Sequence, residues 1–406
     1  MWQQGSALPV LVVGGGVAGM QAALDLANAG VQVVLAEKEA RLGGQVMRLD
    51  KVYPTDHCAF CPVWTQARAC REHPRITVAT GTTVLELETA SGGSTLAVLR
   101  REALPVDPRA CVFCGLCAPA CPKKAIMGRA PDLPWDPSAP PVAHIDLSRC
   151  DQCGACARVC PAGAIDFSRR AAEERLEVRD CVVAGGFFEP RPAPAPEFGA
   201  HSHPDILTAM AFETWSAEFN TTPGSMAARP CCPSDGRPVR RLAFIQCAGA
   251  RDRRELPYCA AVCCMHAAKQ AVWLKRRYPE MEITIFYTDM RAPGKAQEAY
   301  MQRAREAGIR FVRRRPGLVT PLAPQEKGIA IRHEQGQDVA ATHVDLLVLN
   351  GGLAACPQPG GDKAQPTRPA SCGFCREPAD IAQSVIQAGH AAARLCADAR
   401  HDEVKN

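Results

Sequence analysis

The sequence predicts an α/β protein in which two doubly wound units are combined with a small cysteine-rich insert. Three observations lead to this fold class. Residues 9–37 read as a strand, a glycine-rich turn, a helix and a second strand. A further β-α-β-α-β pattern begins at residue 241, and such alternation is typical of parallel sheets. Between the two patterns, residues 111–160 carry eight cysteines at regular spacing.

The composition limits the class of protein. The chain has 406 residues and a formal net charge of +5, so it is long enough for two or three domains and has no block of charge that favours nucleic acid. Its 22 cysteines are grouped at metal-cluster spacing, and no signal peptide opens the chain. This usage predicts a reducing compartment, the cytoplasm. No apolar run approaches the ~18 residues of a membrane span, so we expect membrane association only through a partner.

The first element is a nucleotide-binding turn. The apolar strand Val10–Val13 runs into Gly14-x-Gly16-x-x-Gly19 and an Ala/Leu-rich helix. In this context Gly14 makes the turn, Gly16 lets the pyrophosphate approach the helix N-terminus, and Gly19 lets the helix pack on the strand. Glu37, about twenty residues further on, is expected to bond a ribose hydroxyl.

The residues after Glu37 favour FAD over NAD. Lys38 and the pair Gly43-Gly44 complete a pattern that resembles the two-dinucleotide-binding-domain, thioredoxin-reductase-like flavoproteins. In that class a strand ending in small residues closes the FAD domain, as the stretch 176–187 with Gly186 does here. A final helix, expected from Asp380, points its N-terminus at the flavin, where its dipole stabilises negative charge on the reduced ring.

The insert carries two C-x2-C-x2-C-x3-C-P runs, the bacterial ferredoxin pattern. In the two-cluster version of this module the fourth cysteine of each run ligates the other cluster. We therefore expect one 4Fe–4S cluster on Cys111, Cys114, Cys117 and Cys160, and a second on Cys150, Cys153, Cys156 and Cys121. Two zinc ribbons are the alternative, which two complete runs at close range disfavour.

The second doubly wound unit lacks a nucleotide fingerprint. Its first strand is followed not by G-x-G-x-x-G but by a loop rich in cysteine, with Cys247, Cys259, Cys263 and Cys264. We infer that this unit has lost nicotinamide binding and gained a cluster. Chemistry alone leaves a vicinal redox pair or buried thiols equally open, because adjacent cysteines rarely both ligate one cluster.

Other cysteines have no single interpretation. A cluster or zinc role, a redox dithiol and simple burial all stay open for Cys58, Cys61 and Cys70. A surface pair without function or a ligand pair is open for Cys231 and Cys232. Cys372 and Cys375 form a last C-x2-C, a candidate redox dithiol near the flavin.

Several longer motifs resemble one family. The segments FIQCAGARD, PYCAAVCCMHAAKQA, FYTDMRAPGK and GFCREPADIAQSVIQA resemble the A-type subunits of heterodisulfide reductases and the related A-type subunits of quinone-interacting oxidoreductases. The resemblance implies that the four cysteines at 247–264 hold a third 4Fe–4S cluster near FAD. It also implies that Lys269 lies near the flavin ring, where it would hydrogen-bond N5 or N1 and act as the candidate catalytic residue.

The resemblance implies an oxidoreductase: an FAD- and iron–sulfur-containing electron-transfer subunit, with flavin-based electron bifurcation as one mode of action. The implied partners are B- and C-like subunits or a quinone-interacting membrane subunit, together with a hydrogenase, formate dehydrogenase or NADH module, around a homodimeric core. One alternative is a self-contained NAD(P)H:ferredoxin oxidoreductase, which needs a nicotinamide fingerprint that the sequence lacks. Others are a dithiol–disulfide flavoenzyme using Cys263–Cys264, and an assembly scaffold.

These assignments divide the chain as follows: a first part of the FAD domain at 8–104, the two-cluster ferredoxin insert (α+β) at 105–170, an FAD-domain return and linker at 171–235, the second Rossmann-like unit at 236–316, and a second part of the FAD domain at 317–406.

Overall fold

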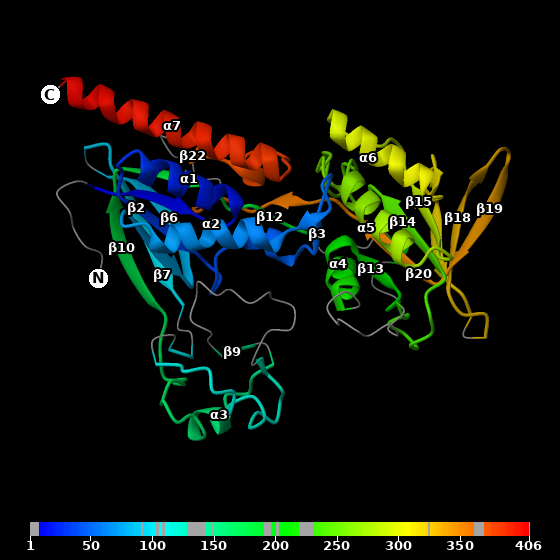
Figure 1. Cartoon of the computed structure of the whole chain (residues 1–406), viewed down its shortest axis with the longest axis horizontal. Coiled ribbons are helices and arrows are strands. Elements are labelled where there is room, and N and C mark those ends of the chain that lie inside the picture. Colours follow the sequence, from blue (N-terminus) through cyan, green and yellow to red (C-terminus); the bar gives the residue numbers. More distant parts are fainter. Residues whose placement is uncertain are drawn as a thin grey trace.

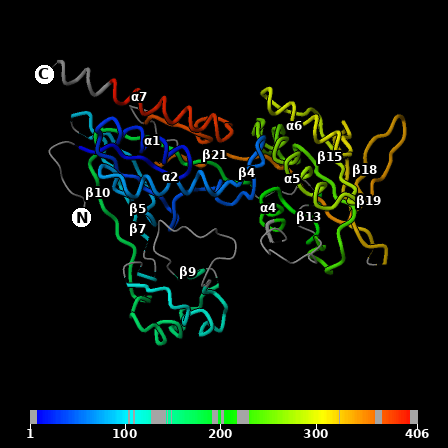
Figure 2. Tube along the Cα trace, viewed as in Figure 1, coloured from blue at the N-terminus to red at the C-terminus, as the bar shows by residue number. Residues whose placement is uncertain are grey.

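The computed structural model has two lobes side by side and a small insert that projects from the first lobe (Figure 1). It describes residues 8–405 apart from 91, 103–104, 108–109, 128–142, 148, 191–195, 200–202, 219–229, 324 and 361–368. The trace in Figure 2 shows that the N-terminal and C-terminal parts of the chain meet in the first lobe, whereas the middle of the chain forms the second.

The first lobe is built on a five-stranded parallel sheet of order β22-β11-β1-β2-β5. Apolar side chains cover both faces, as parallel sheets require. Helices α1, α2 and α7 pack on one face, so the last helix of the chain lies against the first. The bounds are β1 Val10–Val13, β2 Val33–Glu37, β5 Ile76–Thr80, β11 Asp180–Val183, β22 Ala370–Ser371, α1 Val17–Asn28, α2 Phe60–Glu72 and α7 Ile381–Lys405.

A three-stranded antiparallel sheet of order β10-β7-β6 covers the other face and carries the insert. The insert leaves after β7 and returns at β10, and these strands pair Arg101 with Ala172, so its two ends lie side by side. A module can therefore be inserted between β7 and β10 without any change in the strands of the first lobe. The bounds are β6 Thr82–Thr89, β7 Thr95–Arg101, β10 Ala172–Val178 and, within the insert, β8 Ile126–Met127, β9 His144–Ile145 and α3 Ala155–Arg158.

The second lobe repeats this plan. Its parallel sheet has the order β13-β20-β14-β15-β16, with α4, α5 and α6 on one face and the antiparallel sheet β17-β18-β19 on the other. The bounds are β13 Ile206–Thr208, α4 Ala209–Glu218, β14 Arg241–Gln246, α5 Cys263–Arg277, β15 Glu282–Phe286, α6 Lys295–Glu306, β16 Arg310–Val312, β17 Leu318–Pro321, β18 Ile329–Gln335, β19 Asp338–Val344 and β20 Leu346–Asn350.

Two boundaries differ from the expectation. Residues 206–218, 318–323 and 325–350 were expected in the FAD-domain return and the second FAD-domain part, but they lie in the second lobe. The reason is the strand order: β20, late in the chain, inserts between β13 and β14. The stretch 176–187, expected as one strand, supplies parts of β10, β11 and β12 (Phe187–Phe188) in three different sheets.

Short elements connect the lobes. The strand β12 pairs with β21 (Ala354–Ala355), and β3 (Lys51–Val52) pairs with β4 (His57–Cys58) in a hairpin that follows the short helix η1 (Gly44–Arg48). Two further single turns are η2 (Pro196–Phe198) and η3 (Gly373–Cys375). Over the described ranges, none of the helices has the length and apolar content needed to cross a membrane.

Candidate functional site

The turn between β1 and α1 is made of backbone. Gly14 has a φ of +102°, and a side chain on it would collide with the carbonyl oxygen of Ala184. A side chain on Gly19 would collide with the carbonyl oxygen of Gly14. At Gly16 a side chain would meet only the Cα of Gly44, at 4.0 Å. Gly14 and Gly19 therefore allow close packing, whereas the space in front of Gly16 is open to a ligand.

A second glycine pair lies against this turn. Gly43 donates its N–H to the carbonyl oxygen of Gly15 over 2.7 Å. A side chain on Gly44 would lie 3.0 Å from the Cα of Gly16. The result is a cradle of bare backbone at the N-terminus of α1, whose N-cap residue Gly16 makes no side-chain capping bond. Such a helix N-terminus fits the pyrophosphate of a dinucleotide, because its N–H groups and dipole favour anions.

Glu37 closes the cradle from β2. Its Oε2 accepts the Gly15 N–H over 2.6 Å and its Oε1 accepts the Glu39 N–H over 2.8 Å. Burial raises the pKa of Glu37 above its ordinary value, although both hydrogen bonds oppose the rise. A carboxylate has about four acceptor sites, so two remain for ribose hydroxyls. Gly15, which the fingerprint pattern does not single out, is also needed, since a side chain there would meet Glu37 and Leu42.

The other expected flavin-binding residues lie around the same lobe. Gly186 follows β11 with a φ of +70° and accepts the Cys356 N–H. Lys38 lies near Cys356, where its charge opposes the rise in pKa that burial causes on that thiol. Asp380 begins α7 with a capping box: its Oδ1 accepts the Gln383 N–H over 2.8 Å, and Gln383 Oε1 accepts the Asp380 N–H over 3.1 Å.

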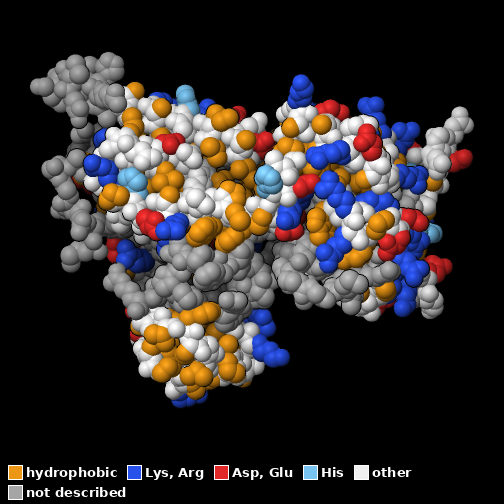
Figure 3. Space-filling view, in the orientation of Figure 1, with side chains coloured by type: hydrophobic (Ala, Val, Ile, Leu, Met, Phe, Trp, Pro, Cys, Tyr) orange, Lys and Arg blue, Asp and Glu red, His pale blue; other side chains and the backbone are white. Residues whose placement is uncertain are grey.

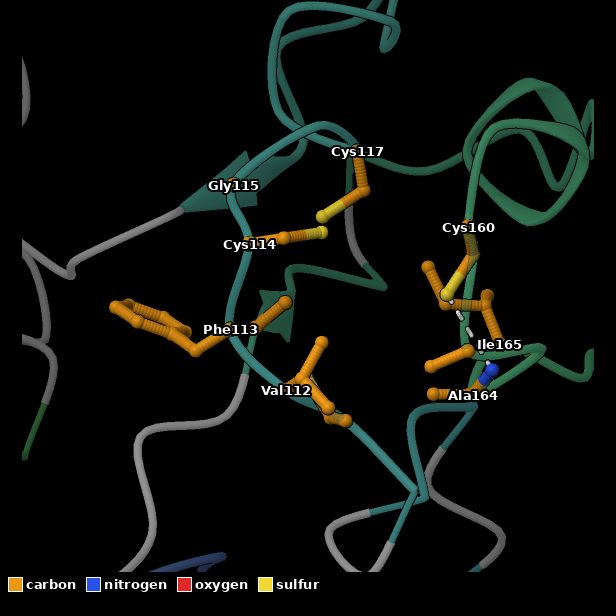
Figure 4. A pocket seen from close by; sticks show the side chains of 11 residues that line it. Val112, Phe113, Cys114, Gly115, Cys117, Cys160, Ala164 and Ile165 are labelled. Carbon is orange, nitrogen blue, oxygen red and sulfur yellow. Dashed lines mark hydrogen bonds between the residues drawn. The ribbon is translucent and has the colours of Figure 1, made fainter.

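The insert brings cysteines from its two runs together. Cys111, Cys114, Cys117 and Cys160 line one pocket, the same four residues expected to share a cluster. Figure 4 shows the sulfurs of Cys114 and Cys117 pointing into a common space that Cys160 faces from the opposite side. Burial raises the pKa of the Cys117 thiol, and the nearby thiols of the other three add to the rise. This crowding suits a polynuclear cation that would neutralise four thiolates.

Three of the four cysteines expected at the second cluster also lie near one another. Cys121 and Cys150 both raise the pKa of the Cys156 thiol, after the larger effect of burial. The two cysteine loops have the same backbone conformation at matching positions. The angle φ is positive at Phe113 and Gly115 in the first loop and at Gln152 and Gly154 in the second. Backbone N–H groups donate to cysteine sulfurs over 3.3 Å, from Ala125 to Cys121, from Gln152 to Cys150 and from Ala164 to Cys160. Such N–H···S bonds stabilise a negatively charged cluster and help set its potential.

Four thiols also meet in the second lobe. Cys247 directly follows β14 with a φ of +57°, whereas Cys263 and Cys264 open α5. Burial raises the pKa of Cys263, and the thiols of Cys264, Cys247 and Cys259 raise it further. Burial, with the thiols of Cys247 and Cys259 adding to its effect, raises the pKa of Cys264 to about 11, although a backbone hydrogen bond from Arg291 opposes the rise. The four residues expected as ligands of a third cluster thus lie within mutual electrostatic reach.

Lys269 lies in a buried polar network that the sequence did not reveal. Its Nζ donates to Glu213 Oε1 over 2.6 Å and to the carbonyl oxygen of Lys51 over 3.1 Å. Glu213 also accepts from His266 Nε2 at 2.9 Å and from Gln270 Nε2 at 2.7 Å. Burial by itself would raise the pKa of Glu213, but Lys269 and His266 outweigh it, so the pKa lies below its ordinary value. One of the three ammonium protons remains for a ligand.

This network lies where the β3–β4 hairpin of the first lobe meets the second. The Asp50 N–H donates to Glu213 Oε1 over 3.0 Å. Asp56 accepts from the Tyr300 hydroxyl over 2.6 Å and from Arg276 over 2.9 Å. Tyr53 is close enough to Asp380, Cys263 and Cys264 that their charges add to the rise in its pKa that burial causes. The start of α7, the four thiols and the Lys269 network therefore adjoin one interface.

The remaining cysteines separate by exposure. Cys58 and Cys61 are exposed, whereas Cys70 is buried and packs in the core of the first lobe. Cys232 is buried beside Asp345, whose carbonyl oxygen accepts its thiol proton. Cys372 and Cys375 are both buried, and Cys375 donates to the carbonyl oxygen of Val183.

No compact site for a single metal ion stands beside these cysteines. In the described part of the chain, no three His, Cys, Asp or Glu side chains gather as ligands of one metal ion. The four thiolates of a 4Fe–4S cubane lie further apart than the ligands of a single metal ion, because each thiolate binds a different iron.

The insert also carries an apolar surface. Hydrophobic side chains gather on it in Figure 3, and the large exposed ones there are Val112, Leu116, Leu147 and Val159.

Two family models match the chain. The model described as FAD dependent oxidoreductase matches residues 9–67, which hold the glycine cradle and the β3–β4 hairpin. The model described as 4Fe-4S dicluster domain matches residues 110–165, which hold both cysteine runs.

Curated relatives cover most of the chain. It is 36% identical over 422 residues to the second iron-sulfur A-type subunit of the CoB–CoM heterodisulfide reductase of Methanopyrus kandleri, with 95% of this chain and 63% of the relative covered. It is 30% identical to the A-type subunit of the H2:CoB-CoM heterodisulfide,ferredoxin reductase of Methanothermobacter marburgensis, with the same coverage. The chain thus spans less than two thirds of the length of these relatives.

Solved structures show the fold. The thioredoxin reductase of T. acidophilum superposes with a TM-score of 0.53 at 11% identity, covering 97% of this chain and 99% of the other. The thioredoxin reductase of Lactococcus lactis, in the FR conformation, gives 0.51 at 13% identity, covering 96% and 99%. The expected fold class, a thioredoxin-reductase-like flavoprotein with an inserted 4Fe–4S dicluster module, is confirmed.

Proposed function

Since this chain is related in sequence, over most of its length, to the A-type subunits of heterodisulfide reductases, we propose that it is an FAD- and iron–sulfur-containing electron-transfer subunit of a heterodisulfide-reductase-like complex. One observation carries the proposal. A nucleotide cradle made of glycine backbone lies on the same chain as two groups of neighbouring cysteines, and each group includes a cysteine from the other run: Cys111, Cys114, Cys117 and Cys160 in one, and Cys150, Cys156 and Cys121 in the other.

The chain's own residues divide the work. The cradle of Gly14, Gly16, Gly19, Gly43 and Gly44 would hold the pyrophosphate, with Glu37 on the ribose. When bound, FAD exchanges electrons in pairs and iron–sulfur clusters exchange them singly, so the protein supplies spacing and electrostatics. Lys38, Gly186 and Asp380 belong to the same proposed FAD site.

We further propose a third 4Fe–4S cluster on Cys247, Cys259, Cys263 and Cys264. Support comes from their mutual electrostatic reach and from the loop that stands where a nicotinamide fingerprint would be. Lys269 is the proposed residue at the flavin ring. Glu213 and the carbonyl oxygen of Lys51 each accept one of its N–H bonds, and the third N–H is the one it would direct at flavin N5 or N1.

The partners follow from the same relationship. Names of relatives include H2-, formate- and ferredoxin-dependent heterodisulfide reductases, so we propose a multi-subunit redox complex with a donor module on one side and heterodisulfide reductase B- and C-like subunits on the other. Electron bifurcation at the flavin is part of this proposal, as is a cytoplasmic location.

Composition of anaerobically purified protein tests the proposal most directly. We expect one FAD, with about twelve irons and as many acid-labile sulfides per chain, and cubane paramagnetic signals on reduction. About eight irons would leave only the insert clusters. Protein without flavin or without any cubane signal would refute the assignment.

Two assays separate the alternative enzymes. Robust NADH turnover with a dye by the chain alone would favour a self-contained NAD(P)H:ferredoxin oxidoreductase. Rapid stoichiometric labelling of Cys263 and Cys264 in the holoprotein would favour a dithiol–disulfide enzyme, because cluster ligands resist alkylation.

A further inference from the structure

Two buried side-chain amides end neighbouring strands of the second sheet. Gln246 is the last residue of β14 and Asn350 the last of β20, and the two strands pair these residues with each other. Gln246 is 2% exposed and Asn350 is 1% exposed. The amide nitrogen and oxygen of both side chains make no hydrogen bond with any described residue.

Four such atoms together indicate a bound group. Burying an amide without a partner is costly, and native proteins satisfy the large majority of buried polar atoms. The amides lie at the carboxyl edge of an open parallel sheet, where such folds bind their ligands. Apolar side chains would avoid this cost at the two positions. The presence of two amides there is explained if they contact a polar group of the holoprotein.

The direction of the side chains shows on which face of the sheet that group would lie. Along β14 and β20, Leu242, Phe244, Leu346 and Val348 face the side of the sheet that α4 and α5 cover. Alternation along a strand puts Gln246 and Asn350 on this same side. Figure 1 shows α4 and α5 beside β14 and β20.

The proposed cluster ligands lie at the same edge. Cys247 directly follows Gln246 in the chain. Cys263 and Cys264 begin α5, the helix that connects β14 to β15 and so starts at the carboxyl end of β14. The amides are thus on the helix-covered face, at the sheet edge where these three cysteines meet.

We propose that Gln246 and Asn350 donate their side-chain N–H groups to sulfurs of the cluster held by Cys247, Cys259, Cys263 and Cys264, and so raise its reduction potential. This inference rests on the third cluster of the proposed function. Reduction adds one negative charge to a cluster, and an N–H donor stabilises the charged, reduced form more than the oxidised form. These side-chain donors would distinguish the reduction potential of this cluster from those of the other cubanes on this chain.

Apolar replacements of the same shape test the proposal. Gln246→Met and Asn350→Leu remove the donors, and neither breaks a hydrogen bond within the described protein, so both should fold. We expect the ratio of reduced to oxidised third cluster at a fixed potential to fall about tenfold, equal to about 59 mV for a one-electron couple. Potentiometric titration followed by electron paramagnetic resonance measures this ratio.

Two references accompany the titration. The clusters of the insert provide an internal reference and should keep their potentials. Thr284→Val, a buried polar-to-apolar change between Ile283 and Ile285 and so on the opposite face of the same sheet, is the matched control and should shift nothing. An unchanged third-cluster potential in both amide variants overturns the inference and leaves the proposed function standing. Wild-type protein with about eight irons overturns the third cluster itself, and with it the inference.

A measurement on the wild-type chain removes dependence on the variants. Glutamine and asparagine side chains are labelled with ¹⁵N, and pulsed electron paramagnetic resonance is recorded on the reduced third cluster. We expect ¹⁵N coupling from hydrogen-bonded amides at this cluster. If the cluster is present without such coupling, the amides bind water or each other instead, and the inference is wrong.

Discussion

Lys269 of α5 and Glu213 of α4 form a buried ion pair whose atoms Nζ and Oε1 lie 2.6 Å apart. The lysine is 4% exposed and the glutamate 2% exposed. A charge this deep is tolerated only with a partner and full hydrogen bonding, and Glu213 accepts from Lys269, His266 and Gln270. The pair therefore fixes the ammonium group at the interface of the lobes.

Removing one partner should be costly. Glu213→Ala leaves Lys269 buried without its partner, and Lys269→Met does the same to Glu213. In each variant we expect a loss of about 3–5 kcal/mol in the free energy of unfolding. Urea denaturation followed by circular dichroism measures it. The exposed pair Arg68–Glu72, 2.8 Å apart, is the matched control, and Arg68→Ala should cost no more than about 0.5 kcal/mol. Equal losses at both pairs would contradict the buried network.

The stability should depend on pH through His266. Burial lowers the pKa of His266 below its ordinary 6.5, and the nearby Lys269 lowers it further. Below pH 6.5 the unfolded chain therefore binds a proton that the folded chain does not, so the free energy of unfolding falls as the pH drops from about 7.5 to about 5.5. In His266→Gln this slope should be smaller. His57→Gln, at an exposed position, should keep the wild-type slope, and a wild-type slope in His266→Gln would refute the assignment.

Two glycine variants should separate folding from flavin binding. Gly16→Ala places its methyl group 4.0 Å from the Cα of Gly44, so the protein should fold and yet lose at least about tenfold, or about 1.4 kcal/mol, in FAD affinity. In Gly19→Ala the methyl group collides with the Gly14 backbone, so the lobe itself should be destabilised. Flavin absorbance and thermal unfolding distinguish the two effects.

Gly317→Ala is the control for the glycine variants. It has open space around its Cα and should change neither flavin content nor stability. Full FAD content in Gly16→Ala would show that the pyrophosphate does not approach this residue.

Serine variants should reveal how the insert cysteines are shared. If the fourth cysteine of each run serves the other cluster, Cys160→Ser and Cys114→Ser should both abolish the same paramagnetic signal, and each should remove up to about four irons. Cys121→Ser should instead match Cys153→Ser. The opposite pairing, with Cys160→Ser resembling Cys153→Ser, would mean that each run holds its own metal site.

Much of the fold and site could be read from local patterns. The Gly14–Gly19 turn, the cysteine runs and the β14–β15–β16 succession all depend on spacing within a few residues or one β-α-β unit, where chain geometry leaves few options. The placement of β20 could not be read in this way. An apolar strand fits either lobe, and only packing decided that it lies between β13 and β14.

The sequence by itself determined which chemistry this chain carries: the dinucleotide turn, the two cysteine runs and the cysteines that stand in place of a second fingerprint. Each is a short-range pattern, because metal ligands and tight turns require certain residue types at fixed separations. Tertiary structure alone decided that Glu213 meets Lys269, that Asp50 and Asp56 join the lobes, and that Gln246 meets Asn350. The partners lie far apart in the chain, since Asp50 meets Glu213 and Asp56 meets Tyr300, and only the burial of two apolar sheets brings them into contact.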